Sequence, residues 1–504
     1  MSSLSSFIKK YKEINPEKLA IVYQEDRISY SKFFEKIIIF ACWLKSKEVK
    51  KGDIVAVIMK NSSRFLDIMF AVSHLGAVFL PLNYRLSYNE IKYIYNHAGA
   101  KILLADDEFN SNLKEIPNIF SIDQIYQTEL YNSNSNYPFS ISDLDLIPEK
   151  LDGDDLYRLM YTSGTTDYPK GVIHKYKNFY SKTIDQSKNL NLFEKDKLLI
   201  VGPMYHVGGI DLPGVAILWL GGSLVINREF SPELVLQTIE KEKITGVWFA
   251  PVMTNAILNF NERFDYDVSS LRWCIGGGEK TPESRIIEFN NFFPNARYID
   301  AYGLTETVGG DTLMVPGKEI IKIGSVGKAI DNLEIEIRDE FGKPLGIRKE
   351  GEICLRGSKV TDGYWKDDQR TKASFYANKW FKTGDIGYLD NDQFLFLTDR
   401  KKDMIISGGE NISSSEVERV IYLYEDILEV AVIGLPDQKW GEMVTAIVVP
   451  KKETKIESTA IINHCRKNIA RFKVPKRIFF TEELPRNPSG KVLKRVLRET
   501  YYKK

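Results

Sequence analysis

Short apolar runs alternate with helical patterns up to about residue 330, and this alternation constrains the fold most strongly. Asp53–Met59, Lys101–Ala105 and Gly246–Ala250 are typical of buried strands, whereas Tyr30–Leu44 and Pro232–Glu242 have helical spacing. Strands that alternate with helices predict an α/β fold with doubly wound, mainly parallel sheets. Ligands of such folds bind beyond the carboxyl ends of the strands.

After about residue 330 the pattern becomes β-rich. Leu333–Arg338 alternates strictly between apolar and charged residues, as a half-exposed strand does, and Glu352–Arg356 and Phe394–Thr398 are similar. The charged stretch Asp399–Asp403 (DRKKD) then lacks apolar periodicity, which is typical of a linker and equally of a solvated turn. We expect a small β-rich subdomain at about residues 330–398, followed by a hinge at residues 399–403.

The last hundred or so residues have a compact α+β pattern. Ser413–Glu416 (SSSE) predicts a capping box that opens a helix. Two strands are expected next, at Leu428–Gly434 and Val444–Val449, and a further helix at Ser458–Ile469. The predicted domains are therefore residues 1–398, which include the β-rich subdomain, and residues 404–504 beyond the hinge.

Composition indicates a cytoplasmic protein of ordinary globular type. A hydrophobic fraction of 43% allows a large core, and a net charge of +1 gives no electrostatic case for binding nucleic acid. The apolar stretch Ile210–Ile226 is interrupted by Asp211 and Pro213, which argues against a transmembrane segment. The cysteines are widely spaced and form no Cys-x-x-Cys pair, which is typical of reduced thiols: Cys42, Cys274, Cys354 and Cys465.

The segment Tyr161–Gly171 (YTSGTTDYPKG) has the strongest functional signal. It follows an expected strand at Leu156–Met160 and combines glycines, hydroxyl side chains and Lys170. Glycine lets backbone amides approach a ligand closely, hydroxyls donate to phosphate oxygens, and lysine neutralises phosphate charge. The segment is not a Walker A loop, because it contains no Gly-Lys-Ser/Thr. It predicts a phosphate-binding loop of another kind.

This segment resembles the phosphate loop of the adenylate-forming superfamily, which contains acyl-CoA synthetases, adenylation domains and firefly luciferase. Further stretches match motifs of that family in the expected order: Tyr205-His206, Asp300–Glu306 (DAYGLTE), Lys382–Asp385 (KTGD), Asp399–Asp403 and Asn487–Lys491 (NPSGK). The resemblance covers nearly the whole chain and is greatest to bacterial fatty-acyl-CoA synthetases. It implies a large AMP-binding domain and a small, mobile C-terminal domain.

The resemblance implies a site for ATP. Tyr302 would offer a flat face to adenine, and Asp385 would accept hydrogen bonds from the ribose hydroxyls with Arg400 nearby. The nucleotide-binding residues that it implies are Thr162, Ser163, Gly164, Thr165, Thr166, Lys170, Gly277, Gly278, Asp300, Ala301, Tyr302, Gly303, Asp385 and Arg400.

The same resemblance implies the catalytic residues. Lys491 would bridge the substrate carboxylate and the α-phosphate, whose negative charges otherwise repel each other. Glu306 is the expected Mg²⁺ ligand, because magnesium prefers hard oxygen ligands beside nucleotide phosphates. Thr305 would contact the α-phosphate, and His206 would lie near the carboxylate, although a purely structural histidine stays an alternative.

A second half-reaction with coenzyme A is implied as well. In the resembling acyl-CoA synthetases the C-terminal domain rotates after pyrophosphate leaves, and the thiol then attacks the acyl-adenylate. The pivot would be Lys402, and the loop that joins the thiol tunnel would contain Gly408, Gly409, Glu410 and Asn411.

The acid pocket is expected around His206, Val207, Gly209, Gly276 and Gly309. Its glycines remove side-chain bulk, which favours a medium- or long-chain fatty acid, with an aryl acid as the alternative. The stretch after His206 lacks the Phe-Asp pair that amino-acid-activating relatives use, which argues against an amino acid.

Alternatives to an acid–CoA ligase stay open. The chain could load a carrier-protein thiol, as free-standing adenylation enzymes do. It could also be a catalytically impaired nucleotide- or acyl-binding relative, since most relatives have glycine where this chain has Asp167. We expect a monomer or a homodimer.

Overall fold

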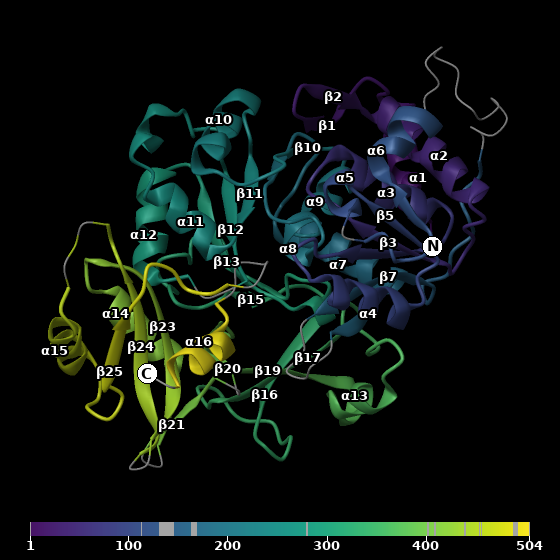
Figure 1. Ribbon diagram of the computed structural model, residues 1–504. Helices are drawn as coiled ribbons and strands as arrows, with labels where there is room; N and C mark the ends of the chain where they lie inside the picture. The colour runs from purple at the N-terminus through teal and green to yellow at the C-terminus, as the bar shows by residue number, and fades with distance from the viewer. Residues whose placement is uncertain are drawn as a thin grey trace.

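The structure is a computed structural model, and Figure 1 shows its arrangement of sheets and helices. It describes residues 2–111, 113–130, 146–162, 169–278, 281–400, 403–407, 410–437, 440–452, 454, 456–486 and 492–502, with only the backbone at 129, 399, 400, 410 and 411. The described residues form four sheets. No helix among them is both long and apolar enough to cross a membrane.

A six-stranded sheet has the order β6-β5-β3-β4-β7-β8. Its strands are β3 (Ile54–Ile58), β4 (Val78–Leu82), β5 (Ile102–Ala105), β6 (Ile119–Ser121), β7 (Leu156–Thr162) and β8 (Lys170–Lys175). All neighbours pair in parallel except β7 and β8, which are antiparallel and flank the expected phosphate loop. The helices of this part are α2 (Tyr30–Ser46), α3 (Ser63–His74), α4 (Tyr88–Ala98), α5 (Asp107–Asn110), α6 (Ile122–Gln124) and α7 (Tyr176–Asn189).

Local sequence explains where these helices begin and end. Ser87 accepts a hydrogen bond from the backbone of Glu90, whose side chain bonds back to Ser87, so α4 begins with a capping box. The helix ends at Gly99, whose φ of 79° lies in the left-handed region that glycine adopts without strain.

A nine-stranded sheet has the order β15-β14-β13-β12-β11-β9-β10-β1-β2. Its strands are β1 (Leu19–Tyr23), β2 (Asp26–Ser29), β9 (Lys197–Ile200), β10 (Ser223–Ile226), β11 (Gly246–Phe249), β12 (Trp273–Gly276), β13 (Arg297–Tyr302), β14 (Thr312–Leu313) and β15 (Lys328–Ala329). The strands from β1 to β13 pair in parallel, apart from the β1–β2 hairpin. Its helices are α8 (Val207–Ile210), α9 (Gly214–Trp219), α10 (Pro232–Glu242), α11 (Pro251–Leu258) and α12 (Glu283–Phe292).

The prediction of an α/β fold with mainly parallel sheets is therefore confirmed. Sequence reasoning missed one feature, because β1 comes from the N-terminal region and pairs with β10, about 200 residues later. The N-terminal hairpin is thus part of the second sheet, a long-range pairing that local periodicity does not reveal.

The β-rich part is an antiparallel sheet of the order β16-β17-β19-β18, with β20 paired to β19. Its elements are β16 (Leu333–Arg338), β17 (Gly351–Gly357), α13 (Asp368–Ala373), β18 (Phe375–Tyr376), β19 (Trp380–Leu389) and β20 (Leu395–Arg400). The three strands expected here are confirmed. However, β20 continues through Arg400, so the first two residues of the expected linker belong to a strand.

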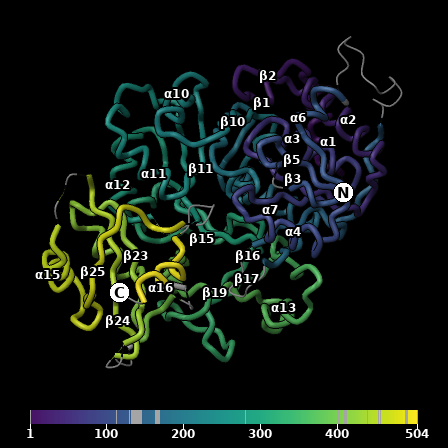
Figure 2. Tube along the Cα trace, in the orientation of Figure 1, coloured from purple at the N-terminus to yellow at the C-terminus, as the bar shows by residue number. Residues whose placement is uncertain are grey.

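The C-terminal part has the sheet order β22-β21-β24-β23, with β25 paired to β24. Its elements are β21 (Ile405–Ser407), β22 (Glu410–Ile412), α14 (Ser414–Tyr422), β23 (Ile427–Asp437), β24 (Gly441–Pro450), α15 (Ser458–Asn468), β25 (Arg477–Phe480) and α16 (Lys494–Tyr501). Ser413 caps α14 by accepting from the backbone of Glu416, but the Glu416 carboxylate accepts from Lys473 at 2.7 Å, so only the Ser413 half of the expected capping box is seen. In Figure 2 this part (yellow-green to yellow) lies beside the β-rich sheet (green) and next to α12 (teal).

Polar contacts between described residues join the C-terminal part to the rest of the molecule at two places. The hydroxyls of Ser413 and Ser415 donate to the carbonyl oxygen of Thr398 at the end of β20. Arg419 on α14 forms an ion pair with Glu283 on α12, with an N–O distance of 3.4 Å.

The largest core lies around α1 (Ser5–Ile14), α2 and α3. The rings of Phe7 and Phe33 contact Phe70 on α3 edge-on, with centroid distances of 5.5 and 5.2 Å. The apolar residues at the start of α1 are thus part of the core. The four cysteines are buried, free thiols.

Replacement of Phe70 by alanine should destabilise the protein strongly. The ring is fully buried between α1 and α2, so its loss leaves a cavity and should lower the free energy of unfolding by about 3–5 kcal/mol. The matched control is Phe341→Ala, because this ring is 86% exposed and its loss should cost less than about 0.5 kcal/mol. Urea unfolding of both variants tests this, and equal midpoints would contradict it.

Candidate active site

The carboxyl end of β13 forms the centre of the candidate site. Asp300, Ala301 and Tyr302 are its last residues, and the chain then turns sharply at Gly303. A Cβ at Gly303 would lie 2.3 Å from the backbone nitrogen of Gly310, so glycine is required there. The turn leads into a short 3₁₀ helix, Thr305–Thr307, which places Thr305 and Glu306 beyond the strand. This is the sheet edge where sequence analysis expected a ligand.

Tyr302 and Asp385 join two sheets at this edge. The Tyr302 hydroxyl donates to Asp385 Oδ2 at 2.8 Å, linking β13 to β19 of the β-rich sheet. Both side chains are buried, and burial raises the pKa of Tyr302 well above its usual value, so the phenol stays a donor. The expected adenine and ribose residues are therefore brought together.

Glu306 lies in a second polar cluster with Lys170. Lys170 Nζ contacts Glu306 Oε1 at 2.7 Å, and the Tyr364 hydroxyl donates to the same oxygen at 2.9 Å. Lys170 also donates to the Tyr364 oxygen at 2.8 Å. Sequence analysis missed Tyr364, because no motif marks it. The buried Oγ1 of Thr162, at the start of the expected phosphate loop, has no hydrogen-bond partner among the described residues, which suits a site built for an external acceptor or donor.

The residues present fit a Mg²⁺ ion that arrives with a nucleotide. Glu306 offers a hard carboxylate oxygen ligand. Among the described residues, no group of three or more His, Cys, Asp or Glu side chains is placed to hold a metal by itself. A divalent cation at Glu306 would therefore need further ligands from the nucleotide phosphates, which is how magnesium is commonly held.

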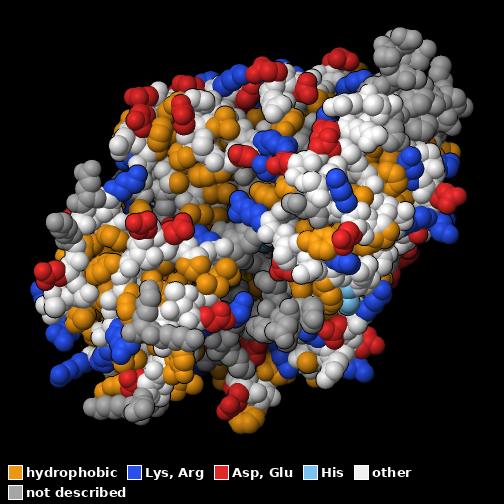
Figure 3. Space-filling view, in the orientation of Figure 1, with side chains coloured by type: hydrophobic (Ala, Val, Ile, Leu, Met, Phe, Trp, Pro, Cys, Tyr) orange, Lys and Arg blue, Asp and Glu red, His pale blue; other side chains and the backbone are white. Residues whose placement is uncertain are grey.

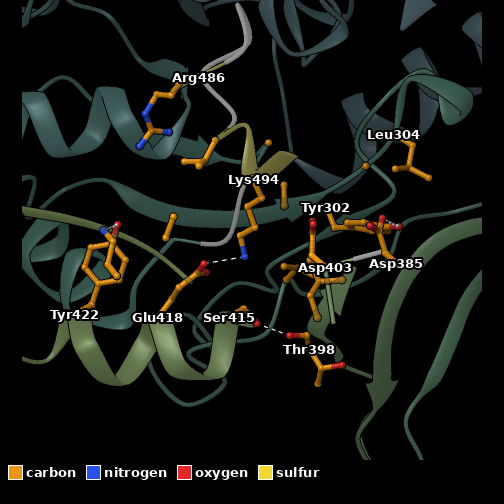
Figure 4. A pocket seen from close by; sticks show the side chains of 18 residues that line it. Tyr302, Leu304, Asp385, Thr398, Asp403, Ser415, Glu418, Tyr422, Arg486 and Lys494 are labelled. Carbon is orange, nitrogen blue, oxygen red and sulfur yellow. Dashed lines mark hydrogen bonds and ion pairs between the residues drawn. The ribbon is translucent and has the colours of Figure 1, made fainter. Parts of the chain in front are cut away.

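A cavity of about 230 Å³ opens beside Tyr302, between the nine-stranded sheet, the β-rich sheet and the C-terminal part. Figure 4 shows Tyr302 and Asp385 on one side of it, with Glu418, Tyr422 and Lys494 from the C-terminal part on another. In the space-filling view the face is hollowed near its centre, where lysine or arginine side chains border the opening (Figure 3). Its other lining residues include Gly278, Ala301, Gly303, Leu304, Val326, Thr398, Asp403, Ser415 and Arg486.

The C-terminal side of this cavity is charged and was not found from sequence. Lys494, at the start of α16, donates to Ser414 at 2.6 Å and contacts Glu418 at 2.8 Å. Arg486 forms an ion pair with Glu429 at 3.1 Å. These pairs attach the segments on either side of residues 487–491 to α14 and β23.

His206 precedes α8 and caps it, since its Nδ1 accepts from the backbone nitrogen of Gly208 at 3.2 Å. Val207 and Gly209 lie on that helix. The indole of Trp248 packs closely on this region, because a Cβ at Gly202 or Gly208 would lie 2.7 or 2.8 Å from its ring carbons.

The glycines of the expected acid pocket leave less space for an acid than the sequence predicts. A Cβ at Gly276 would lie 2.0 Å from the Tyr298 hydroxyl oxygen, and one at Gly209 would lie 1.9 Å from the Pro203 carbonyl oxygen. These two glycines allow close packing within the protein instead of enlarging an acid pocket. The expectation of extra space at Gly276 is therefore wrong, whereas a Cβ at Gly309 would meet Val207 at an ordinary contact distance of 3.4 Å.

Other predicted site residues lie outside the described residues: Ser163, Gly164, Thr165, Thr166, Asp167, Lys402, Gly408, Gly409 and Lys491. The side chains of Arg400, Glu410 and Asn411 are not described either. Gly277 and Gly278 follow β12, next to the end of β13, as expected.

Fold and cavity together define a nucleotide-binding protein with a large α/β part and a small C-terminal part. The chain belongs to the AMP-binding enzyme family: the model for AMP-binding enzymes matches residues 9–365, and the model for their C-terminal domain matches residues 416–491. This agrees with the resemblance to adenylate-forming enzymes.

Two curated relatives act on different acids. The chain is 34% identical to a long-chain-fatty-acid–CoA ligase, FadD13, of Mycobacterium tuberculosis, over 90% of this chain and 89% of the relative. It is 31% identical to a 2-succinylbenzoate–CoA ligase of Geobacillus kaustophilus, over 99% of this chain and 98% of the relative.

A solved structure has the same architecture. ATP-bound MatB of Rhodopseudomonas palustris superposes with a TM-score of 0.88 at 27% identity, over 100% of this chain and 99% of that one. The o-succinylbenzoate–CoA synthetase of Bacillus subtilis with its acyl-adenylate gives 0.85 at 29% identity, over 98% and 97%.

The stability of the protein should depend on His206 below neutral pH. Burial lowers the pKa of His206 to about 4, with Asp211 opposing and Arg158 reinforcing the shift. In the unfolded chain the imidazole takes up a proton at about pH 6.5. The stability that depends on a neutral His206 is therefore present above that pH and is lost as the pH falls toward 4. His206→Asn should therefore show a smaller drop in melting temperature between pH 7 and 4.5 than the wild type. Parallel curves would contradict this.

Proposed function

We propose that the chain is an AMP-forming acid–CoA ligase, which makes an acyl-adenylate and pyrophosphate from a carboxylic acid and ATP, and then an acyl-CoA and AMP. The observation that carries the proposal is the cavity beside Tyr302, where the Tyr302–Asp385 pair faces the C-terminal part. The Lys170–Glu306 pair lies just beyond the same strand end. This arrangement suits a nucleotide whose phosphates meet a lysine and a magnesium ligand.

In the adenylation step, we assign adenine to the Tyr302 face and ribose to Asp385. Lys170 and Thr162 would bind phosphate oxygens, and Glu306 would hold Mg²⁺, which neutralises phosphate charge when it is bound. Lys491 would bring positive charge to the reacting carboxylate and α-phosphate, so that their mutual repulsion is offset as they approach.

The second step would use a different placement of the C-terminal part. We propose residues 1–398 and 404–504 as the two domains, with a hinge at 399–403 that pivots at Lys402. Support comes from the weak type of the polar contacts seen between described residues of the two parts, which are two serine hydroxyls on one carbonyl oxygen and one ion pair between partly exposed side chains. Gly408, Gly409, Glu410 and Asn411 would then face the CoA thiol.

The acid is proposed to be a medium- or long-chain fatty acid, as for the Mycobacterium relative. A compact aryl acid is the second candidate, favoured by Trp248, whose indole packs against Gly202 and Gly208 where a longer acid would need room. A carrier-protein thiol remains the alternative acceptor to CoA. The oligomeric state, a monomer or a homodimer, remains a prediction.

One experiment tests the function directly. Pyrophosphate release is measured with ATP and Mg²⁺ for dodecanoate, palmitate, benzoate, 2-succinylbenzoate and phenylalanine, each with and without CoA. Release that needs an acid, with acyl-CoA as product, supports the proposal. Pyrophosphate release without acyl-CoA as product would favour a carrier-protein thiol as the acceptor. Absence of pyrophosphate release with every acid of the panel would contradict the proposal that the protein adenylates one of them.

Lys491→Ala should separate the two half-reactions. We expect pyrophosphate release to fall by about 10²–10³-fold, the usual cost of removing one preorganised group that stabilises transition-state charge. Thioester formation from a supplied acyl-adenylate should be largely retained, because that step no longer joins two anions. Equal loss in both half-reactions would refute the separate roles. The control is Arg495→Ala, which removes a nearby positive charge from an exposed position on α16 and should leave both rates unchanged.

Trp248→Ala should shift the choice of acid. Removal of the indole opens space beside α8, so kcat/KM for dodecanoate relative to benzoate should rise about tenfold, the scale on which a pocket senses a change of size. The ratio is measured on one preparation, so a lower folded fraction does not affect it. A ratio within about twofold of the wild type would place the size limit elsewhere.

A further inference from the structure

A group of charged and ionisable side chains is buried away from the cavity beside Tyr302. Arg158 on β7, His174 on β8, Lys182 on α7 and Asp211 after α8 are each at most 1% exposed. Burial of charge is costly unless each group is paired, so such a group needs a structural or functional reason.

One end of this group contacts the catalytic segment. Arg158 and His174 face each other on paired strands, and Arg158 Nε donates to His174 Nδ1 at 2.9 Å. An arginine only donates, so Nδ1 must accept and the ring proton must lie on Nε2. His174 Nε2 then donates to the carbonyl oxygen of Thr305 at 2.6 Å. Burial lowers the pKa of His174 well below its usual value, which agrees with a neutral ring.

The other end contacts the expected acid pocket. Arg158 Nη2 forms an ion pair with Asp211 Oδ2 at 2.5 Å. Asp211 ends α8, and its backbone nitrogen donates to the Val207 carbonyl oxygen at 3.2 Å. Lys182 Nζ donates to the Asp211 carbonyl oxygen. The helix that carries the acid-pocket residues is thereby attached to the same arginine that orients His174.

We propose that Asp211, Arg158 and His174 form a positioning relay that couples occupancy of the acid pocket to the placement of Thr305, and so to binding of MgATP. This inference rests on the proposed function of the site. An acid that shifts α8 moves Asp211, Arg158 follows its carboxylate, and His174 carries the change to the segment that contains Glu306. By linkage the effect is reciprocal, so MgATP strengthens binding of the acid by the same factor.

Binding measurements test the relay without turnover. The probe is α,β-methylene-ATP with Mg²⁺, whose α–β bond is not cleaved, titrated calorimetrically into the full chain. The titration is done with and without a saturating amount of the panel acid that gives the fastest pyrophosphate release. In the wild type the acid should lower the nucleotide Kd by about tenfold, within the usual range of coupling.

The decisive variant is Arg158→Met/Asp211→Leu. Both partners of the ion pair are removed together, so neither of them is left facing an unpaired charge, and the double variant should be more stable than either single variant. We expect its nucleotide Kd to change by less than about twofold when acid is added. His174→Leu is the second variant: it removes the donor to Thr305, so it should also abolish coupling and should weaken nucleotide binding even without acid.

The control is Lys101→Met/Asp53→Leu, which removes an ion pair of 2.8 Å at the amino ends of β5 and β3, opposite the site. This control should keep the wild-type coupling between acid and nucleotide binding. If it lost the coupling, removal of any ion pair would be enough to disturb the protein, and the relay would be overturned. Wild-type coupling retained in folded Arg158→Met/Asp211→Leu or His174→Leu would overturn it too, as would a wild-type Kd that acid does not change. Acid-dependent pyrophosphate release without coupling would remove the relay and leave the proposed function standing.

Discussion

The hydrogen bond from Tyr302 to Asp385 is the interaction on which the site depends. It joins the carboxyl end of a parallel sheet to an antiparallel sheet that follows much later in the chain. Because both partners are buried, the bond is protected from competing water, and loss of one partner would leave a buried polar group unsatisfied. The cavity beside Tyr302 lies where two sheets of different type meet. Each sheet contributes some of the side chains that line it, and neither sheet supplies the full set.

The same edge also separates two kinds of polar group. Lys170, Glu306 and Tyr364 surround the position expected for phosphates; Lys170 is partly exposed, whereas Glu306 and Tyr364 are buried. Arg158, His174 and Asp211 lie behind them and are closed off from solvent. Lys170 of the first group can exchange partners with a ligand, whereas the second group contacts only other parts of the protein and acts by positioning them. The buried polar side chains therefore support the polar side chains that surround the expected phosphate position.

Local periodicity predicted several strands and helices, because β3, β5, β11, α2 and α10 each have an apolar pattern that is visible within a few residues. It could not predict the pairing of β1 with β10, since the partners are far apart in sequence. Part of the candidate site was predicted in another way, from motifs that resemble those of adenylate-forming enzymes. Tyr302 and Asp385 belong to recognisable motifs, but Tyr364, Lys494 and Glu418 act through positions that only the tertiary structure brings together. The expectation that Gly276 leaves space for the acid was wrong, because the space beside a glycine can be filled by a ligand or by a neighbouring side chain, here that of Tyr298.

The polar contacts described between the C-terminal part and the rest of the molecule are of a weak kind. Exposed ion pairs such as Arg419–Glu283 are typically worth about 0–1 kcal/mol, comparable to the thermal energy of about 0.6 kcal/mol. The hydroxyl contacts of Ser413 and Ser415 with Thr398 can be exchanged for water at small net cost. If this part moves as proposed, the molecule that fills the cavity beside Tyr302 would contribute to holding it in place. The nucleotide itself would then decide when the two parts stay together, and the departure of its pyrophosphate would be enough to let them separate.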